Sequence, residues 1–291
     1  MDSALPDHHA VRHTFNRFAG IYDEHAALEQ EVGSRLLERL DFHRLTPQRI
    51  VDLGCGTGLT SAALKARFRK AQVIGLDSSR MMLAQLQRRS AFLRPLRAVC
   101  ANFAALPLPE RSSELVFSNL ALQWSIELDS LFAEIRRVLA PGGMLLFSSL
   151  GPGSFWELRT ALADCGAAQS VREFVDILDV GNALVAAGFQ EPVMDAERIT
   201  LSYPDSDALV NELEATGSAL LLSGNHNLAD TFDGLDAAYQ RLKVAGRYPV
   251  SYEIVYGAAF GPNEGQPRKT EQGDLATFSV ESLLKSRGTR S

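Results

Sequence analysis

The chain has 291 residues, of which 46% are hydrophobic and 22% charged, and its formal net charge is −6. This composition is typical of a globular, water-soluble protein, and the acidic balance argues against bulk nucleic-acid binding. No apolar stretch reaches the roughly 18 residues that would span a bilayer, and the polar first 13 residues do not form a signal peptide. Three widely spaced cysteines fit a reducing compartment and predict no metal site. We therefore expect a cytoplasmic protein.

Residues 1–45 are predicted to form a helical segment that precedes the first core strand. Apolar residues recur there at three- and four-residue steps, beginning with Phe15, Phe18 and Tyr22 and continuing to Leu40. Because the segment comes before the sheet begins, it must lie outside it. It is either an amphipathic helix packed on the domain or a lid over a ligand.

The stretch from Val51 to Gly58 organises the rest of the chain. An apolar run leads into three glycines at alternate positions, and a helical pattern follows. This is a buried strand, a tight turn and a helix N-terminus, which brings backbone N–H groups close to a ligand. A second strand, residues 73–76, ends on Asp77, where an acidic residue can bind ribose hydroxyls. The third glycine comes one residue too early for a dinucleotide fingerprint.

This Asp52-x-Gly-x-Gly-x-Gly form resembles motif I of the class I S-adenosylmethionine (SAM) methyltransferases. The resemblance implies an α/β fold, a Rossmann-like seven-stranded sheet with helices on both faces, and SAM as cofactor. It also implies that Asp52 and the glycines face the methionine part of SAM and that Asp77 faces the ribose. The expected cofactor-binding residues are Asp52, Gly54, Cys55, Gly56, Gly58, Asp77, Ser78, Met82, Asn102, Phe103, Asn119 and Leu120.

The remaining strands of the SAM-binding core, residues 46–150, follow in βα alternation. Ser78-Ser79 is a plausible N-cap, and a third strand over residues 96–101 ends at Asn102, where relatives usually have Asp. The fourth strand runs into the exit loop that ends at Trp124, which should face the transferred methyl group. A Pro-Gly-Gly turn at 141–143 leads into the fifth strand, residues 144–149.

Beyond residue 150 the βα rhythm breaks. Helices are predicted at 156–165, 177–187 and 205–223, with a sixth strand at 193–201 and a last, antiparallel strand at 246–256. We expect residues 151–260 to form a substrate-side helical insertion plus the last strands. The composition of residues 261–291 predicts a mobile C-terminal tail.

Three more specific sequence segments narrow the resemblance to one family within the class I methyltransferases. They are the F-x-R-x-A-x-x-Y-D start at Phe15, the run Ser118–Trp124, and Gly246-Arg247-Tyr248-Pro249. Together they resemble the malonyl-acyl carrier protein O-methyltransferases of biotin synthesis over roughly residues 11–260. In that family the free carboxylate of the malonyl thioester is methylated, which implies an acyl carrier protein as partner. The implied catalytic residue is Tyr22, and the candidate substrate-binding residues are Gln123, Trp124, Ser154, Arg159 and Arg172.

The chemistry of such a reaction sets further expectations. A malonyl carboxylate is ionised at pH 7, so no general base is required. The carboxylate calls for a cation or hydroxyl in the pocket, and an acidic carrier protein calls for a basic rim. Arg88, Arg89, Arg94 and Arg97 either form that rim or are a solvated face. We expect a monomer that binds neither nucleic acid nor membrane.

Two departures from the family pattern, around Arg172 and at Glu214, concern the substrate side and leave three alternatives open. Glu31-Val32-Gly33-Ser34-Arg35 and Ala187-Gly188-Phe189 also resemble a mitochondrial complex I assembly factor that modifies a partner protein. The second alternative is a SAM-binding scaffold without turnover, and the third is a methyltransferase that acts on a quinone ring. The quinone alternative predicts an apolar pocket with a base near the methyl group.

Overall fold

A seven-stranded sheet forms the centre of the molecule in the computed structural model, which describes residues 7–125, 127–164, 171–222, 235–263, 268–270 and 273–275. The strand order is β3-β2-β1-β4-β5-β7-β6. These strands are β1 (Arg49–Leu53), β2 (Gln72–Asp77), β3 (Arg97–Cys100), β4 (Ser113–Ser118), β5 (Leu139–Leu150), β6 (Gln190–Tyr203) and β7 (Tyr248–Phe260). The first five pair in parallel, and β7 runs antiparallel between β5 and β6, as the sequence predicted for the last strand.

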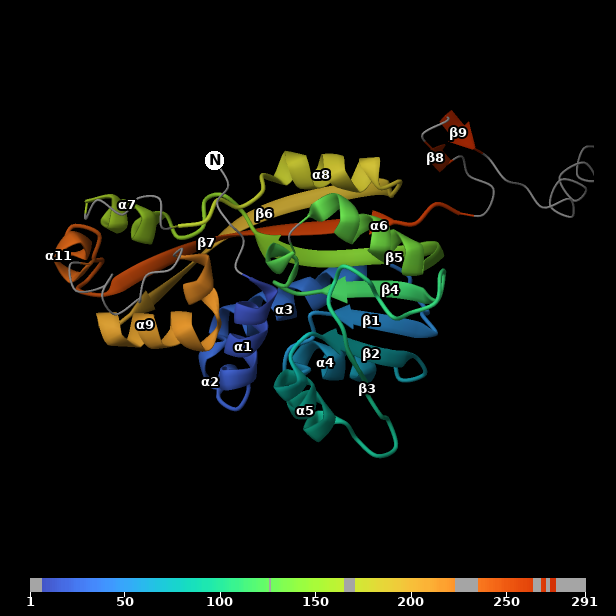
Figure 1. Ribbon diagram of the computed structural model, residues 1–291, viewed down its shortest axis with the longest axis horizontal. Helices are drawn as coiled ribbons and strands as arrows, with labels where there is room; N and C mark the ends of the chain where they lie inside the picture. The colour runs from blue at the N-terminus through green and yellow to red at the C-terminus, as the bar shows by residue number, and fades with distance from the viewer. Residues whose placement is uncertain are drawn as a thin grey trace, which may run out of the picture.

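Helices cover both faces of the sheet, which confirms the predicted fold class (Figure 1). One core packs α3 (Ala27–Arg39), α4 (Leu59–Arg67) and α5 (Arg80–Arg89) against the face that carries Ile50 and Phe117. The other packs α6 (Leu128–Val138) and α8 (Ile177–Ala186) against the face that carries Val51 and Val116. Neighbouring strand residues point to opposite faces, so near-continuous apolar runs serve both cores.

The predicted N-terminal helical segment is present in three pieces. They are α1 (His8–Phe18), α2 (Tyr22–His25) and α3, followed by the short 3-10 helix η1 (Leu40–Phe42). The breaks fall at residues 19–21 and at Ala26. They turn α1 and α2 across the carboxyl ends of the strands, beside α5 and α9.

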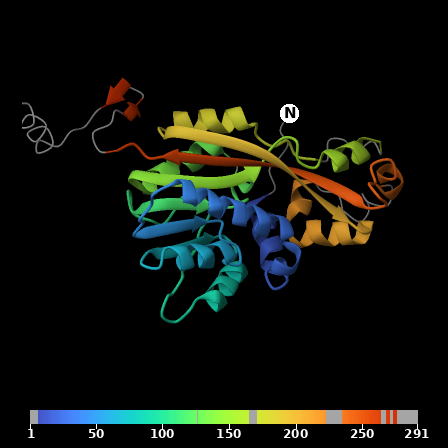
Figure 2. The same cartoon turned by 180° about the vertical axis from the view of Figure 1, so that it is seen from behind.

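The substrate-side helices come from two connections. Residues between β5 and β6 form α7 (Trp156–Asp164) and α8, and those between β6 and β7 form α9 (Ser206–Ala215), η4 (Ser218–Leu221) and α11 (Leu235–Tyr239). The helix predicted over residues 205–223 is broken at Gly217, whose φ is +76°. The long strands β6 and β7 extend beyond the rest of the sheet and carry α7, α9 and α11 at that end, as both views show (Figures 1 and 2). The division of the chain into four domains stays a prediction.

The described part of the tail forms β8 (Arg268–Thr270) and β9 (Gly273–Leu275), which pair with each other. Most of the predicted mobile tail lies outside the described residues. Among the helices that the structure describes, none is both long and apolar enough to cross a membrane.

Candidate active site

The glycine turn lies where the strand order reverses, at the carboxyl ends of β1 and β4. In parallel α/β sheets such a point opens a crevice for ligands. Gly54, Gly56 and Gly58 all have positive φ, a region that glycine enters without steric cost. A Cβ atom on Gly54 would lie 2.3 Å from Cβ of Ala121, so no side chain fits there. The backbone N–H groups of Gly54 and Cys55 donate to the Leu76 carbonyl and fix the turn on β2.

Asp77 ends β2 and faces the same crevice. Its carboxylate accepts hydrogen bonds from the backbone N–H of Gly56 (3.0 Å) and of Ser79 (2.7 Å). Burial raises the pKa of Asp77 to about 6, although these backbone donors act in the opposite direction. The carboxylate is therefore ionised at neutral pH and can accept hydrogen bonds from vicinal hydroxyls.

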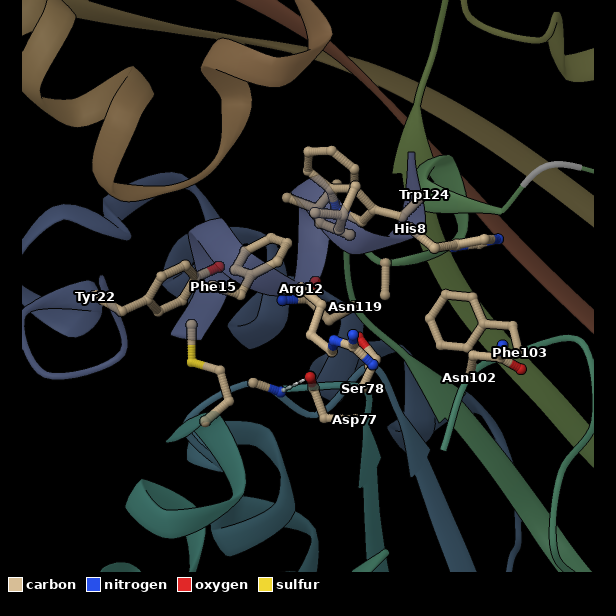
Figure 3. Close-up of a pocket in the computed structure, with 16 residues that line it drawn as sticks. His8, Arg12, Phe15, Tyr22, Asp77, Ser78, Asn102, Phe103, Asn119 and Trp124 are labelled. Atoms are coloured by element: carbon tan, nitrogen blue, oxygen red, sulfur yellow. Dashed lines mark hydrogen bonds between the residues drawn. The ribbon is translucent and has the colours of Figure 1, made fainter. Parts of the chain in front are cut away.

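The strand ends and the N-terminal helices enclose one continuous cavity, shown in Figure 3. Ten of the twelve predicted cofactor residues line it or the neighbouring cavity beneath α3: Gly54, Cys55, Gly56, Asp77, Ser78, Met82, Asn102, Phe103, Asn119 and Leu120. These residues fit a nucleoside with a charged tail. Asp77 meets hydroxyls, Phe103 and Met82 offer apolar surface to a flat ring, and Asn102 offers an amide to its edge.

The other two residues, Asp52 and Gly58, lie behind the turn. Asp52 is 1% exposed, and its carboxylate accepts from the hydroxyls of Thr60 (2.8 Å) and Ser61 (2.5 Å) on α4. Gly58 packs against Leu86. In this structure both residues support the turn, and the direct cofactor contact that the motif implied for them stays a prediction.

Helices α1 and α2 are tied to the turn and to α5 by polar contacts. Asn16 accepts hydrogen bonds from the Ser79 hydroxyl (2.8 Å) and the Met81 N–H (3.2 Å). Asp23 accepts from the Thr57 hydroxyl (2.6 Å) and pairs with Arg89. Arg89, one of the four arginines considered for a basic rim, is thus an anchor of the lid. These contacts hold the N-terminal segment over the crevice.

Tyr22 borders the cofactor cavity, the cavity beneath α3 and a third, inner cavity. Its ring meets Phe15 edge-on at 6.2 Å, and Phe15 meets Trp124 edge-on at 5.4 Å. Figure 3 shows the Tyr22 hydroxyl pointing toward the centre of the pocket. Burial and the carboxylates of Glu29, Asp77 and Asp23 raise the pKa of Tyr22 well above its usual value, so the group is a neutral donor.

The inner cavity lies on the far side of Tyr22 and Trp124, toward α9 and β7. Its lining consists of Phe15, Tyr22, Leu28, Glu29, Leu120, Gln123, Trp124, Leu150, Thr216, Ser218 and Tyr252. The described residues of this lining include hydroxyls, an amide and a carboxyl but neither Lys nor Arg, whereas Arg12 lines the adjoining cofactor cavity. The expectation of a cation in the substrate pocket therefore stays a prediction. Trp124 and Gln123 line this cavity, and their contact with a substrate stays a prediction.

The three other candidate substrate ligands bond to the chain itself. Arg159 donates to the carbonyls of Val171 (3.1 Å) and Arg172 (3.3 Å), and Arg172 donates to the carbonyl of Gln123 (2.8 Å). The Ser154 hydroxyl bonds to the backbone of Glu253. None of the three lines the described cavities, because their polar atoms fix the turns around the pocket.

Several lining residues were not predicted from the sequence. Arg12 stands one turn and His8 two turns before Phe15 on α1, and both face the cofactor cavity with it. The spacing of these three residues along one helix face was the signal that could have found them. Glu29 and Tyr252 gave no such signal, because the fold brings them together from α3 and β7.

Comparison with known proteins agrees with this geometry. A family model described as "Methyltransferase domain" matches residues 51–147. A malonyl-acyl carrier protein O-methyltransferase from Methylovorus sp. is 42% identical over 270 residues, which are 90% of this chain and 91% of that protein. One from Halorhodospira halophila is 40% identical over 98% of both chains.

The chain belongs to the malonyl-acyl carrier protein O-methyltransferase family. Solved structures support the fold. Phosphoethanolamine N-methyltransferase 2 from Haemonchus contortus, in complex with phosphomonomethylethanolamine and S-adenosylhomocysteine, superposes with a TM-score of 0.56. It is 20% identical to this chain, and the match covers 87% of this chain and 60% of the other.

Proposed function

We propose that this protein transfers the methyl group of SAM to the free carboxylate of a malonyl group on acyl carrier protein, an early step of biotin synthesis. The observation that carries the proposal is the similarity, over 90% or more of the chain, to malonyl-acyl carrier protein O-methyltransferases at 40% and 42% identity, joined to a crevice lined by Asp77, Asn102 and Phe103 beside a small inner pocket. We include in the proposal a single chain acting in the cytoplasm.

The residues of the crevice fit SAM in defined places. Asp77 would hold the ribose, Asn102 and Phe103 the adenine, and the turn from Gly54 to Gly56 the methionine part. When bound, SAM supplies a methyl group on a sulfonium, which a carboxylate oxygen accepts as the O–CH3 bond forms and the S–CH3 bond breaks to a neutral thioether. The protein's task is to orient the acceptor and to exclude water.

The polarity of the inner cavity suits this reaction. A carboxylate and a sulfonium lose their opposite charges together, so a strong cation beside the carboxylate would stabilise the reactants more than the transition state. Neutral donors avoid that penalty. Tyr22 is placed to supply one, at the boundary between the cofactor and inner cavities.

The test is methyl transfer from labelled SAM to malonyl-acyl carrier protein, with acetyl-acyl carrier protein as the control that lacks a free carboxylate. We expect a methyl ester on the malonyl carrier alone. Absence of transfer to either carrier, with SAM still bound, would overturn the proposal in favour of a protein that modifies a partner. Labelling of both carriers would place the acceptor outside the malonyl group.

A further inference from the structure

Glu29 places a carboxyl group in the wall of the inner cavity. It lies in the first turn of α3 and borders both this cavity and the one beneath α3, as Tyr22 does. Its Oε2 atom is shielded from solvent and has no hydrogen-bond partner in the structure. A buried carboxyl oxygen without a partner is costly, which indicates that a ligand or a proton completes the site.

Two polar groups in this wall donate within the protein. The Gln123 amide donates one N–H to the Leu120 carbonyl (2.7 Å), and the Thr216 hydroxyl donates to the Glu212 carbonyl (2.9 Å). An acceptor carboxylate entering this cavity would meet the hydroxyls of Tyr22, Ser218 and Tyr252. Glu29, whose Oε2 atom has no partner, can offer a proton only in its neutral form.

The charges around Glu29 favour the neutral form. Tyr22 on α2 and Tyr252 on β7 face it, and both stay neutral because burial raises the pKa of each hydroxyl well above its usual value. Glu212 on α9 adds negative charge, partly balanced by His25. Burial first and Glu212 second raise the pKa of Glu29 to about 7, against the effect of its own backbone N–H.

We propose that Glu29, in its neutral carboxylic acid form, recognises the acceptor. It shares its proton with the substrate carboxylate beside the Tyr22 hydroxyl. This inference rests on the proposed function and assigns a specificity-determining residue to it. The proton remains between the two carboxyl groups and is not consumed. Once the acceptor is methylated, Glu29 keeps its proton, so the step needs no additional acid or base.

The first test is the pH dependence of kcat/KM for malonyl-acyl carrier protein in the wild type, Glu29→Gln and Glu29→Ala. Glutamine keeps a donor of similar shape that does not titrate. We expect wild-type kcat/KM to fall about tenfold or more between pH 7 and 8.5, because kcat/KM reports free-enzyme ionisations. Glu29→Gln should show no such fall, and Glu29→Ala should be low at every pH. Glu38→Gln, an exposed change on the same helix, is the matched control.

Two further readouts separate this role from others. Calorimetry of malonyl-acyl carrier protein binding to the S-adenosylhomocysteine complex at pH 7.5, in two buffers of different ionisation enthalpy, should show proton uptake that is absent in Glu29→Gln. The affinity for SAM itself should be the same in both proteins. A Glu29→Gln variant that binds SAM tenfold more weakly would overturn the proposal and make Glu29 a ligand of the SAM amino group.

If kcat/KM of Glu29→Gln falls between pH 7 and 8.5 as that of the wild type does, this result would also overturn the proposal for Glu29. Failure of the proposed function is distinguishable from both results, because in that case the wild type forms no methyl ester at any pH.

Discussion

The two ends of the active site are built in different ways. The cofactor end consists mostly of short consecutive stretches that follow β1, β2 and β3, and its Asp77 carboxylate accepts from the backbone N–H groups of Gly56 and Ser79. The acceptor end gathers Tyr22, Glu29, Trp124 and Tyr252 from four separate elements. The first end is therefore a local motif that tolerates little change, and the second is a tertiary assembly whose chemistry can be adjusted one side chain at a time.

The largest effect should come from Gly54→Ala at the cofactor end. The new Cβ would lie 2.3 Å from Ala121 on a backbone with φ of +72°, so both steric overlap and strain oppose it. We expect SAM binding to be lost by more than about 100-fold, measured by calorimetry, which corresponds to about 2.7 kcal/mol. Gly56→Ala is the control. Its φ is also positive, but nothing lies within 4 Å of the added atom, so its loss should be clearly smaller.

Asp77→Asn should weaken SAM binding by roughly 10- to 100-fold, since a hydrogen bond to a charged group contributes about 1.5–3 kcal/mol. The pKa of about 6 adds a pH test. As pH falls through that value the wild-type carboxylate takes up a proton and loses acceptor capacity, so wild-type affinity should decline below pH 6 while the Asn variant stays flat. Equal pH profiles in the two proteins would contradict the assignment of Asp77 to the ribose. Asp129→Asn, an exposed change that does not line the crevice, controls for net charge.

The difference between these two ends also explains which parts of the site could be predicted from the sequence. The turn from Gly54 to Gly58, the position of Asp77 and the succession of the strands along the chain follow from local spacing, and the structure confirms them. The roles of Arg159 and Arg172 did not follow, because a sequence does not reveal which guanidinium groups are engaged by carbonyls of neighbouring turns. Glu29 was missed for the same reason, since only the folded chain buries it.

Glu29 at the acceptor end should carry a cost in stability of the kind that burial also imposes on Asp77 at the cofactor end. The pKa of Glu29 is raised from its usual value to about 7, so the folded state holds a proton that the unfolded chain releases. This contribution to stability is complete below pH 4.5 and is lost as pH rises through 7. Glu29→Gln should therefore have a higher free energy of unfolding than the wild type at pH 8, by on the order of 3 kcal/mol, with little difference at pH 4.5, as measured by denaturant unfolding. A larger difference at pH 4.5 than at pH 8 would contradict the sign.

The smallest effect is expected for the replacement of Arg172. It tests the sequence-based hypothesis that Arg172 binds the substrate. If Arg172 bound the substrate carboxylate, its removal would leave a charge unpaired and raise KM for the malonyl carrier by about 100-fold or more. In the structure Arg172 instead holds the Gln123 carbonyl (2.8 Å). Arg172→Met, which keeps the apolar stem, should then lower kcat only about two- to fivefold, the effect of one lost hydrogen bond.

In that variant KM for SAM should not change, because Gln123 borders the inner cavity and not the cofactor cavity. Arg198→Met, an exposed change on β6, should have no effect on either constant. A rise in KM for the malonyl carrier that exceeds the fall in kcat would return Arg172 to the substrate. It would also mean that the acceptor end binds its carboxylate through a cation, in which case the neutral-donor account of Tyr22 and Glu29 fails with it.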